Sequence, residues 1–362
     1  MKKTLRVCLL VLLALVVAAV LVAGGLYFTR FQTLGTIEKL TDYSDGYNIY
    51  EMDVKYAYSL DNILDYGITD NQTMIDAILA EALPGLPVSI KAPSFGCSAF
   101  TMVEETGHVR MGRNYDFKKD SSAMLVYCAP KDGYRSVATA ALDNVSANQP
   151  EQSMKKKLAS LTAPFICLDG LNEKGVSIAV LTLDSEPTFQ QTGKPVIATT
   201  LAIRLVLDRA ATTQEAVELL KNYDMFASSG RDYHFYITDA SGDGRVIEYD
   251  CDDPARPLVD TPIRAITNFY GLYADRVQPN QRNGIYGHGK ERWEKMEAVF
   301  AANEGSFTQQ TGWEALRAAS QLPNPQELTS NTQWSILYDN TALTGQIVLR
   351  RNWEDVVEYA VK

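Results

Sequence analysis

Cys97 is the residue of this sequence best placed to do chemistry, because its neighbours can activate it. It follows Gly96 in the stretch SFGCSAF, and Arg113 and Asp116 come soon after in GRNYDF. A guanidinium beside a thiol favours the thiolate, which is the reactive form. A glycine before the cysteine leaves the preceding carbonyl sterically open to attack by the thiol. The pattern indicates a cysteine nucleophile.

The residues between the two stretches predict a β-hairpin that brings these groups together. Strand-like runs flank EETG, and a turn centred on residues 105–106 places Cys97 opposite Asn114. In that register Arg113 lies next to Cys97, and Asp116 lies just past the end of the strand. We therefore expect a thiol, a guanidinium and a carboxylate to converge.

Cleavage of the Gly96–Cys97 bond would give the nucleophile its own base. The new α-amine of Cys97 has a reference pKa of about 7.7–8.0, so it can accept the thiol proton near neutral pH. In this hypothesis Asp116 holds the amine, and one residue supplies both nucleophile and base.

The rest of the chain predicts an α+β fold of antiparallel sheets covered by helices. Further hairpins are expected within residues 164–183, 233–250 and 332–351. Helical patterns are expected at residues 70–83, 212–223, 290–302 and 312–322, the second opening with a capping box from Thr212 to Glu215.

Composition restricts the partners. The chain has 362 residues, a net charge of −10 and a pI near 5.0, which argues against binding to nucleic acid. The pattern requires no metal or organic cofactor. The sequence does not determine the oligomeric state.

The N-terminus predicts a membrane anchor. Lys2, Lys3 and Arg6 precede an uncharged run, residues 7–28, which as a helix spans roughly the hydrocarbon thickness of a bilayer. The positive flank places the rest of the chain outside the cytoplasm. A cleaved signal peptide and a secreted protein are the alternative. We divide the chain into residues 1–30, a leader at 31–96 and a catalytic domain at 97–362.

Six motifs in order resemble the cysteine N-terminal-nucleophile (Ntn) hydrolases. They are GCSAF, GRNYDF, LDGLNEKGVSIAVLTL, YHFYITDASGDGRVIEY, AITNFY and TQWSILYD. The nearest branch is the choloylglycine hydrolase family, which includes bile salt hydrolases, penicillin V acylases and related linear amide C–N hydrolases. The resemblance implies a four-layer αββα sandwich and hydrolysis of a small nonpeptide N-acyl amide.

The resemblance also assigns roles to individual residues. Cys97 matches the nucleophile, and Arg113 and Asp116 match the charged pair beside it. Asn268 matches the asparagine whose side-chain amide helps to form the oxyanion hole, and Arg292 matches a second active-site arginine.

Thr182 departs from the bile salt hydrolase pattern, which carries an asparagine at the aligned position. A backbone N–H of Thr182 could still serve as an oxyanion donor, whereas a side-chain contact specific to that subgroup would be lost. The acyl group therefore stays open among bile-acid conjugates, aryloxyacetyl or aliphatic N-acyl compounds and acyl-homoserine lactones.

Three other functions compete with this interpretation. A Cys–His enzyme of the papain type would use His288, the histidine nearest to Arg292 in sequence. An anchored, uncleaved binding protein could keep the fold without activity. An acyltransferase would pass the acyl group to an amine instead of water, and the sequence does not separate it from a hydrolase.

Overall fold

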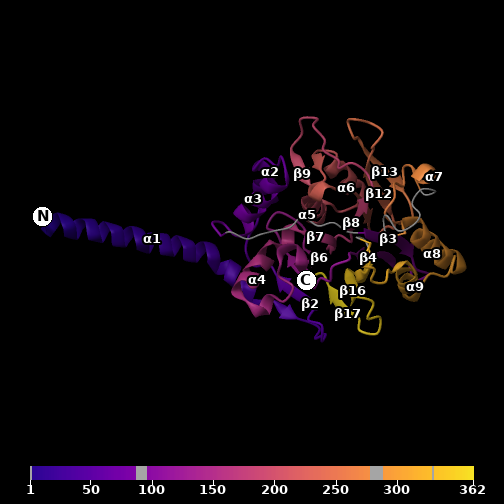
Figure 1. The fold of residues 1–362 in the computed structure, drawn as a ribbon, viewed down its shortest axis with the longest axis horizontal. Coiled ribbons are helices and arrows are strands. Elements are labelled where there is room, and N and C mark those ends of the chain that lie inside the picture. The colour runs from indigo at the N-terminus through magenta and orange to yellow at the C-terminus, as the bar shows by residue number, and fades with distance from the viewer. Residues whose placement is uncertain (1, 87–95, 278–287, 328–329) are drawn as a thin grey trace.

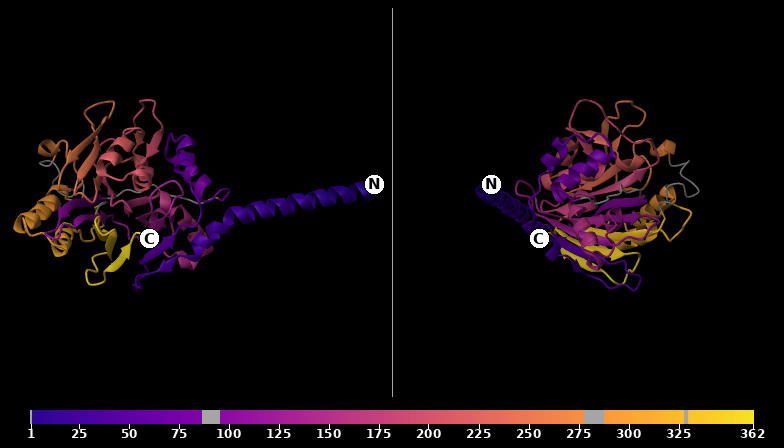
Figure 2. Two further views of the ribbon diagram at one scale, coloured as in Figure 1. Left: turned by 180° about the vertical axis from the view of Figure 1, so that it is seen from behind. Right: turned by 60° about the vertical axis from the view of Figure 1, so that its left-hand side comes forward.

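The computed structural model describes residues 2–86, 96–277, 288–327 and 330–362 (Figure 1). Two large sheets form its body, one over the other, with β3 of one sheet packed on β8 of the other (Figure 2). The α+β fold with antiparallel sheets, as expected, is confirmed.

Within the described residues the larger sheet has nine strands. In spatial order they are β1 (Glu38–Lys39), β2 (Ile49–Asp53), β5 (Ala123–Cys128), β6 (Ser136–Ala141), β7 (Cys167–Asn172), β8 (Ser177–Leu183), β11 (Asp232–Thr238), β12 (Arg245–Tyr249) and β13 (Leu258–Pro262). All neighbours are antiparallel except β2 and β5, which pair in parallel. The hairpins expected at 164–183 and 233–250 form as β7–β8 and β11–β12.

The second sheet carries the predicted nucleophile. Its order is β14 (Ala265–Ile266), β3 (Gly96–Val103), β4 (Val109–Asp116), β15 (Thr332–Asp339), β16 (Thr344–Leu349) and β17 (Val357–Ala360). A short parallel pair, β10 (Asp224–Phe226) and β9 (Val196–Ala198), lies apart from both sheets.

Helices pack against the sheets. They are α1 (Lys2–Gly35), α2 (Leu60–Asp65), α3 (Asn71–Ala82), α4 (Met154–Ala159), α5 (Thr199–Arg209), α6 (Thr213–Leu220), α7 (Ala274–Val277), α8 (Gly289–Ala302) and α9 (Gln309–Ala319), with short 3-10 turns at η1 (Leu142–Val145), η2 (Pro150–Gln152), η3 (Ser160–Phe165) and η4 (Ser228–Gly230). The buried helix α5 covers β7 and β8, while α9 lies on β4 and β15. Sequence reasoning missed α5, which is buried on nearly every face although it carries Arg204 and Asp208.

Side chains cap two helix starts, but only half of the capping box expected from Thr212 to Glu215 forms, because the Glu215 carboxylate accepts from the Ala211 N–H instead. The Thr212 hydroxyl accepts a hydrogen bond from the Glu215 backbone N–H, and Asp70 forms a capping box with Thr73. Each side chain satisfies a backbone donor that the helix itself leaves unpaired.

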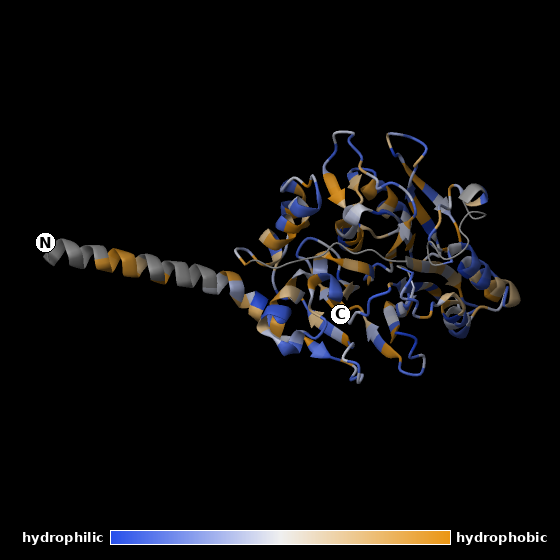
Figure 3. Cartoon of the chain, in the orientation of Figure 1, coloured by the Kyte–Doolittle hydropathy of each residue, from blue (hydrophilic) through white to orange (hydrophobic). Residues whose placement is uncertain are grey.

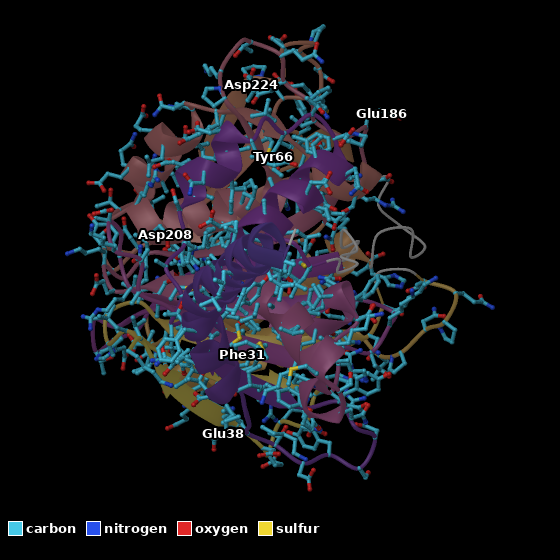
Figure 4. All side chains as sticks on the ribbon, turned by 90° about the vertical axis from the view of Figure 1, so that its left-hand side faces the viewer. Phe31, Glu38, Tyr66, Glu186, Asp208 and Asp224 are labelled. Carbon is cyan, nitrogen blue, oxygen red and sulfur yellow. The ribbon has the colours of Figure 1, made fainter. Side chains whose placement is uncertain are left out.

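The leader contributes a strand that the sequence did not predict. Its β2 extends the larger sheet along β5, and Ile49, Tyr50 and Met52 are buried there. Farther along the leader, the Tyr58 hydroxyl contacts Asp208 of α5, which Figure 4 labels on the face that the leader covers. The leader is therefore built into the core. The proposed boundary at Gly96 stays a prediction.

The N-terminal helix α1 projects from the body (Figure 1). Several of its described apolar side chains, such as Leu10 and Phe28, are exposed, and Figure 3 shows an apolar stretch along it. A search of the described residues finds no helix that is long and apolar enough to cross a membrane. Within the expected span at 7–28, the side chains at 7–8, 15–16 and 18–23 lie outside the described residues. The membrane span stays a prediction.

Candidate active site

The β3–β4 hairpin places Cys97 one residue away from the expected register. Cys97 pairs with Tyr115, and the expected opposite residue, Asn114, faces Ser98 instead. The connection is five residues long, 104–108, and a backbone N–O hydrogen bond of 2.8 Å closes it. Gly107 has a φ of 83° in this turn, a conformation that side chains disfavour. The extra turn residue accounts for the shift.

The thiol still meets the predicted guanidinium. Arg113 Nη1 lies 3.2 Å from Cys97 Sγ, and both side chains are fully buried. Arg113 also forms an ion pair with Asp169, whose Oδ2 lies 2.6 Å from Arg113 Nε. Asp169 also accepts hydrogen bonds from Trp334 Nε1 at 3.2 Å and the Tyr338 hydroxyl at 2.7 Å. Asp169 thus fixes the arginine that touches the thiol.

Sequence reasoning missed Asp169. It lies inside the apolar run PFICLDGL, on β7 of the opposite sheet. A carboxylate in a buried strand needs a charged or polar partner. The aspartate within this apolar run was therefore the available sign of a buried polar site. The identity of the partner depended on the packing of the two sheets.

The backbone of Cys97 is held by two side chains from distant parts of the sequence. Its N–H donates to Asn268 Oδ1 at 2.9 Å, and its carbonyl oxygen accepts from Arg292 Nη1 at 3.1 Å. Arg292 Nη2 also donates to Asn268 Oδ1 at 2.6 Å. Asn268 follows β14 and Arg292 lies on α8, so the end of one sheet and a covering helix meet at Cys97.

Asp116 lies within this cluster but is bound differently from the prediction. It is the last residue of β4, and Gly96 is its cross-strand partner. Its Oδ2 accepts from Arg292 Nη1 at 2.9 Å, and its Oδ1 accepts from the Thr332 hydroxyl at 2.6 Å. Burial raises the pKa of Asp116, and the Arg292 guanidinium opposes that shift. The Asp116 carboxylate is therefore linked to the Cys97 backbone through Arg292, and the Asp116 backbone itself forms a hydrogen bond with the thiol.

Thr182 lies beside Asn268. The side-chain amide of Asn268 donates to the Thr182 carbonyl at 2.8 Å, and Thr182 itself lies on β8 opposite Tyr233. Among the described residues, the buried Thr182 hydroxyl has no hydrogen-bond partner. All six residues predicted from the sequence thus join one network around Cys97.

The three histidines have partners other than the thiol. His108 Nδ1 lies 2.7 Å from Asp339 Oδ2, and His288 Nε2 lies 3.4 Å from Glu327 Oε1. His234 is fully buried on β11 and pairs with Glu248. Among the described contacts none joins a histidine to Cys97 Sγ, so this geometry does not support a Cys–His dyad.

The charges around the thiol balance one another. Arg113 faces Asp169 and Arg292 faces Asp116, so the buried ion pairs sum to zero. A thiolate would add a negative charge in a fully buried place. Burial accordingly raises the pKa of the Cys97 thiol to about 11, and Arg113 opposes only part of this rise. Arg113 lowers the pKa of the thiol, as expected, but desolvation outweighs the guanidinium and the thiol of the intact chain stays protonated at neutral pH.

This pKa predicts slow alkylation of Cys97 in chains that retain the Gly96–Cys97 bond. Below pH 11 the thiolate fraction, and with it the iodoacetamide rate, should rise roughly tenfold per pH unit. The rate is read by mass spectrometry from peptides that span residues 96–97, with Cys251 as the partly exposed reference. A rate that levels off near pH 7 would contradict the predicted pKa.

Within the described ranges no group of three or more histidine, cysteine, aspartate or glutamate side chains is arranged to hold a metal ion. The chemistry available to the described cluster is that of a thiol, two guanidinium groups, two carboxylates and an asparagine amide. These groups suit attack on a carbonyl carbon and stabilisation of the resulting oxyanion.

Comparison with solved structures defines the class of fold. A variant of the conjugated bile acid hydrolase from Clostridium perfringens matches with a TM-score of 0.53 and 14% identity, covering 73% of this chain and 92% of that one. Penicillin V acylase from Agrobacterium tumefaciens matches with a TM-score of 0.54 and 17% identity, covering 73% and 86%. The chain therefore has an Ntn-hydrolase-like fold.

The sequence profile of one family carries the assignment further. Residues 97–268 match the linear amide C–N hydrolases of the choloylglycine hydrolase family, and the match begins at Cys97 and ends at Asn268. Residues 97–268 therefore belong to that family, whose members are hydrolases acting on linear amides. No curated protein sequence matches the chain.

Proposed function

We propose that this protein hydrolyses small N-acyl amides with Cys97 as an N-terminal nucleophile, after cleavage of the Gly96–Cys97 bond. One observation carries the proposal: all three polar atoms of Cys97 have buried partners. Asn268 binds its nitrogen, Arg292 its carbonyl oxygen and Arg113 its sulfur. Such complete anchoring suits a residue whose position determines the reaction.

In the proposed maturation step the Cys97 thiol attacks the Gly96 carbonyl carbon. The C–N bond breaks as the thioester forms, and the proton of the thiol passes to the departing nitrogen, which becomes the α-amine. Water then hydrolyses the thioester, releasing the leader with a Gly96 carboxylate and restoring the Cys97 thiol. The bond between Cys97 N–H and Asn268 Oδ1 supports this step, because it holds the departing nitrogen in place.

In the proposed catalytic cycle the α-amine takes the thiol proton while the sulfur attacks the amide carbon of the substrate. Asn268 and the Thr182 backbone N–H stabilise the oxyanion, and the amine product leaves with the proton. Water then hydrolyses the thioester to a carboxylic acid and regenerates the thiol. The positive charge gained by the α-amine offsets the negative charge of the thiolate. The two ion pairs of the site already have no net charge.

The substrate class follows from the family. The solved relatives are named for conjugated bile acids and penicillin V, which are both small amides. Thr182 replaces the asparagine of the bile salt hydrolase pattern, so we favour a small N-acyl amide outside the bile salt group. An acyltransferase of the same fold differs only in the final acceptor, and product analysis with added amines separates the two.

We further propose that the catalytic domain is held outside the cytoplasm by residues 7–28. The basic residues before the apolar run and the exposed apolar side chains of α1 support this placement. The four-layer αββα arrangement is supported by α5 on the larger sheet and α9 on the smaller one.

Intact mass and N-terminal sequencing test the maturation step. We expect a chain that begins at Cys97, accompanied by the leader, because β2 remains hydrogen-bonded to β5 after the cut. The two pieces should elute together in size-exclusion chromatography and separate only in denaturant. An active enzyme that retains the Gly96–Cys97 bond would show that its base is something other than the α-amine.

A further inference from the structure

A second buried acid–base pair lies behind Asn268. His234 on β11 and Glu248 on β12 are both fully buried, and they lie one step along the ladder from the Phe235–Ile247 pair. His234 Nδ1 is 3.0 Å from Glu248 Oε1, and His234 Nε2 is 3.0 Å from the Thr267 carbonyl oxygen. Neither side chain is needed for the chemistry proposed above.

The partners determine how many protons this pair carries. A carbonyl oxygen only accepts, so His234 Nε2 must donate to Thr267. Nδ1 then faces a carboxyl oxygen, and a neutral ring with an ionised Glu248 would set two lone pairs against each other. A proton must lie between Nδ1 and Oε1. With that proton the pair has no net charge, which suits its complete burial.

His234 and Glu248 form hydrogen bonds with the backbone on both sides of Asn268. His234 binds the carbonyl of Thr267, immediately before it. Glu248 accepts from the backbone N–H groups of Gly271 and Leu272, each at 2.8 Å. Residues 267–272 form no regular strand or helix, so these side chains satisfy backbone groups that no ladder satisfies.

The segment held by His234 and Glu248 also contacts the helix that carries Arg292. The Thr267 hydroxyl donates to the Gly289 carbonyl at 2.5 Å, at the first residue of α8, which carries Arg292. Asn268 and Arg292 together hold the nitrogen and the carbonyl oxygen of Cys97. The segment held by the pair therefore sets the position of both groups.

We propose that His234 and Glu248 are positioning residues for the amide hydrolase reaction, acting through Thr267 and Asn268 as a clamp that shares one proton. The inference rests on the proposed role of Asn268. A shift of about 1 Å in a positioned group can lower a rate by roughly 100-fold. Loss of the clamp should accordingly lower kcat while substrate binding, and hence KM, changes little.

The test compares His234→Gln and Glu248→Gln with the matched control His108→Gln. His108 also pairs with a carboxylate, Asp339, but at the β3–β4 turn. We expect each clamp variant to lower kcat roughly 10- to 100-fold with KM within about threefold of the parent. The double variant should be no slower than the slower single variant, because the two residues act as one unit. His108→Gln should keep the parent kcat.

Two measurements do not depend on catalysis. In the parent labelled with ¹⁵N-histidine, His234 should carry a proton on Nε2 and a second, slowly exchanging proton between Nδ1 and Glu248. In Glu248→Gln the amides of Gly271 and Leu272 should exchange with solvent faster than in the parent. These signals test the clamp even if His234→Gln fails to fold.

The outcomes separate the two proposals. Clamp variants with the kcat of the parent, or a His234 ring with an unprotonated Nδ1, would overturn the clamp alone. A parent that releases no amine from conjugated bile acids, penicillin V or simple N-acyl amides would overturn the proposed function. In that case, protected Gly271 and Leu272 amides would still support a clamp, whereas rapid exchange would overturn it too.

Discussion

Replacing Cys97 with alanine is expected to abolish amide hydrolysis, lowering kcat/KM on the order of 10⁴-fold or more. The variant loses the sulfur that forms the thioester, and the alanine beside Asn268 and Arg292 offers no nucleophile in its place. The same change should leave the Gly96–Cys97 bond uncut, because the thiol is also the proposed agent of maturation. Release of the amine product and the intact mass of the chain measure both effects.

The matched control for this variant is Cys251→Ala. Cys251 is partly exposed, follows β12 and lies outside the cluster around Cys97. We expect it to mature and to hydrolyse amides at the rate of the parent. Circular dichroism melts of both variants establish that they are folded. An active Cys97→Ala variant would refute the cysteine mechanism.

Removing residues 1–86 is expected to prevent folding, although the leader precedes the proposed catalytic domain. The deletion strips β2 from β5 and exposes the face that Ile49, Tyr50 and Met52 cover. Each of these buried side chains contributes about 1.5–3 kcal/mol by burial, and a whole domain is stable by only about 5–15 kcal/mol. The truncated chain should be recovered as aggregate or, if soluble, without a cooperative thermal transition.

A second truncation isolates the contribution of β2. A chain that begins at Gly25 loses the projecting part of α1 but keeps the contacts of Tyr27 and Arg30 with the leader. We expect its melting temperature to match that of the full chain.

Within the leader, Met52→Ala should cost about 2–5 kcal/mol of unfolding free energy. A folded, active chain that starts after the leader would show that β2 is dispensable.

Much of the candidate site was predictable because its residues are marked by type and order. Cys97, Arg113 and Asp116 belong to one hairpin, so short-range geometry alone places them near one another. Asn268 and Arg292 lie far away in sequence, and only the resemblance to a family linked them to Cys97. The structure brings both within hydrogen-bonding distance of the Cys97 backbone.

Other features depended on packing that local patterns do not encode. The register of the β3–β4 hairpin shifted by one residue because its turn holds five residues. Asp169 and His234 lie in strands that pair or pack with segments distant in sequence, and each strand by itself is an ordinary buried run. Their roles became visible only when their partners were known.

The sequence by itself indicated the family, the candidate nucleophile, the hairpins and the helix starts, since these follow from residue type and short-range hydrogen bonding. Tertiary structure alone decided that the leader supplies a strand, that Asp169 holds Arg113 and that the intact thiol is protonated. The physical reason is the same for all three. Strand pairing, ion pairing and desolvation depend on which distant segment covers a residue, and burial reversed the effect on the pKa of Cys97 that its neighbour Arg113 alone predicted.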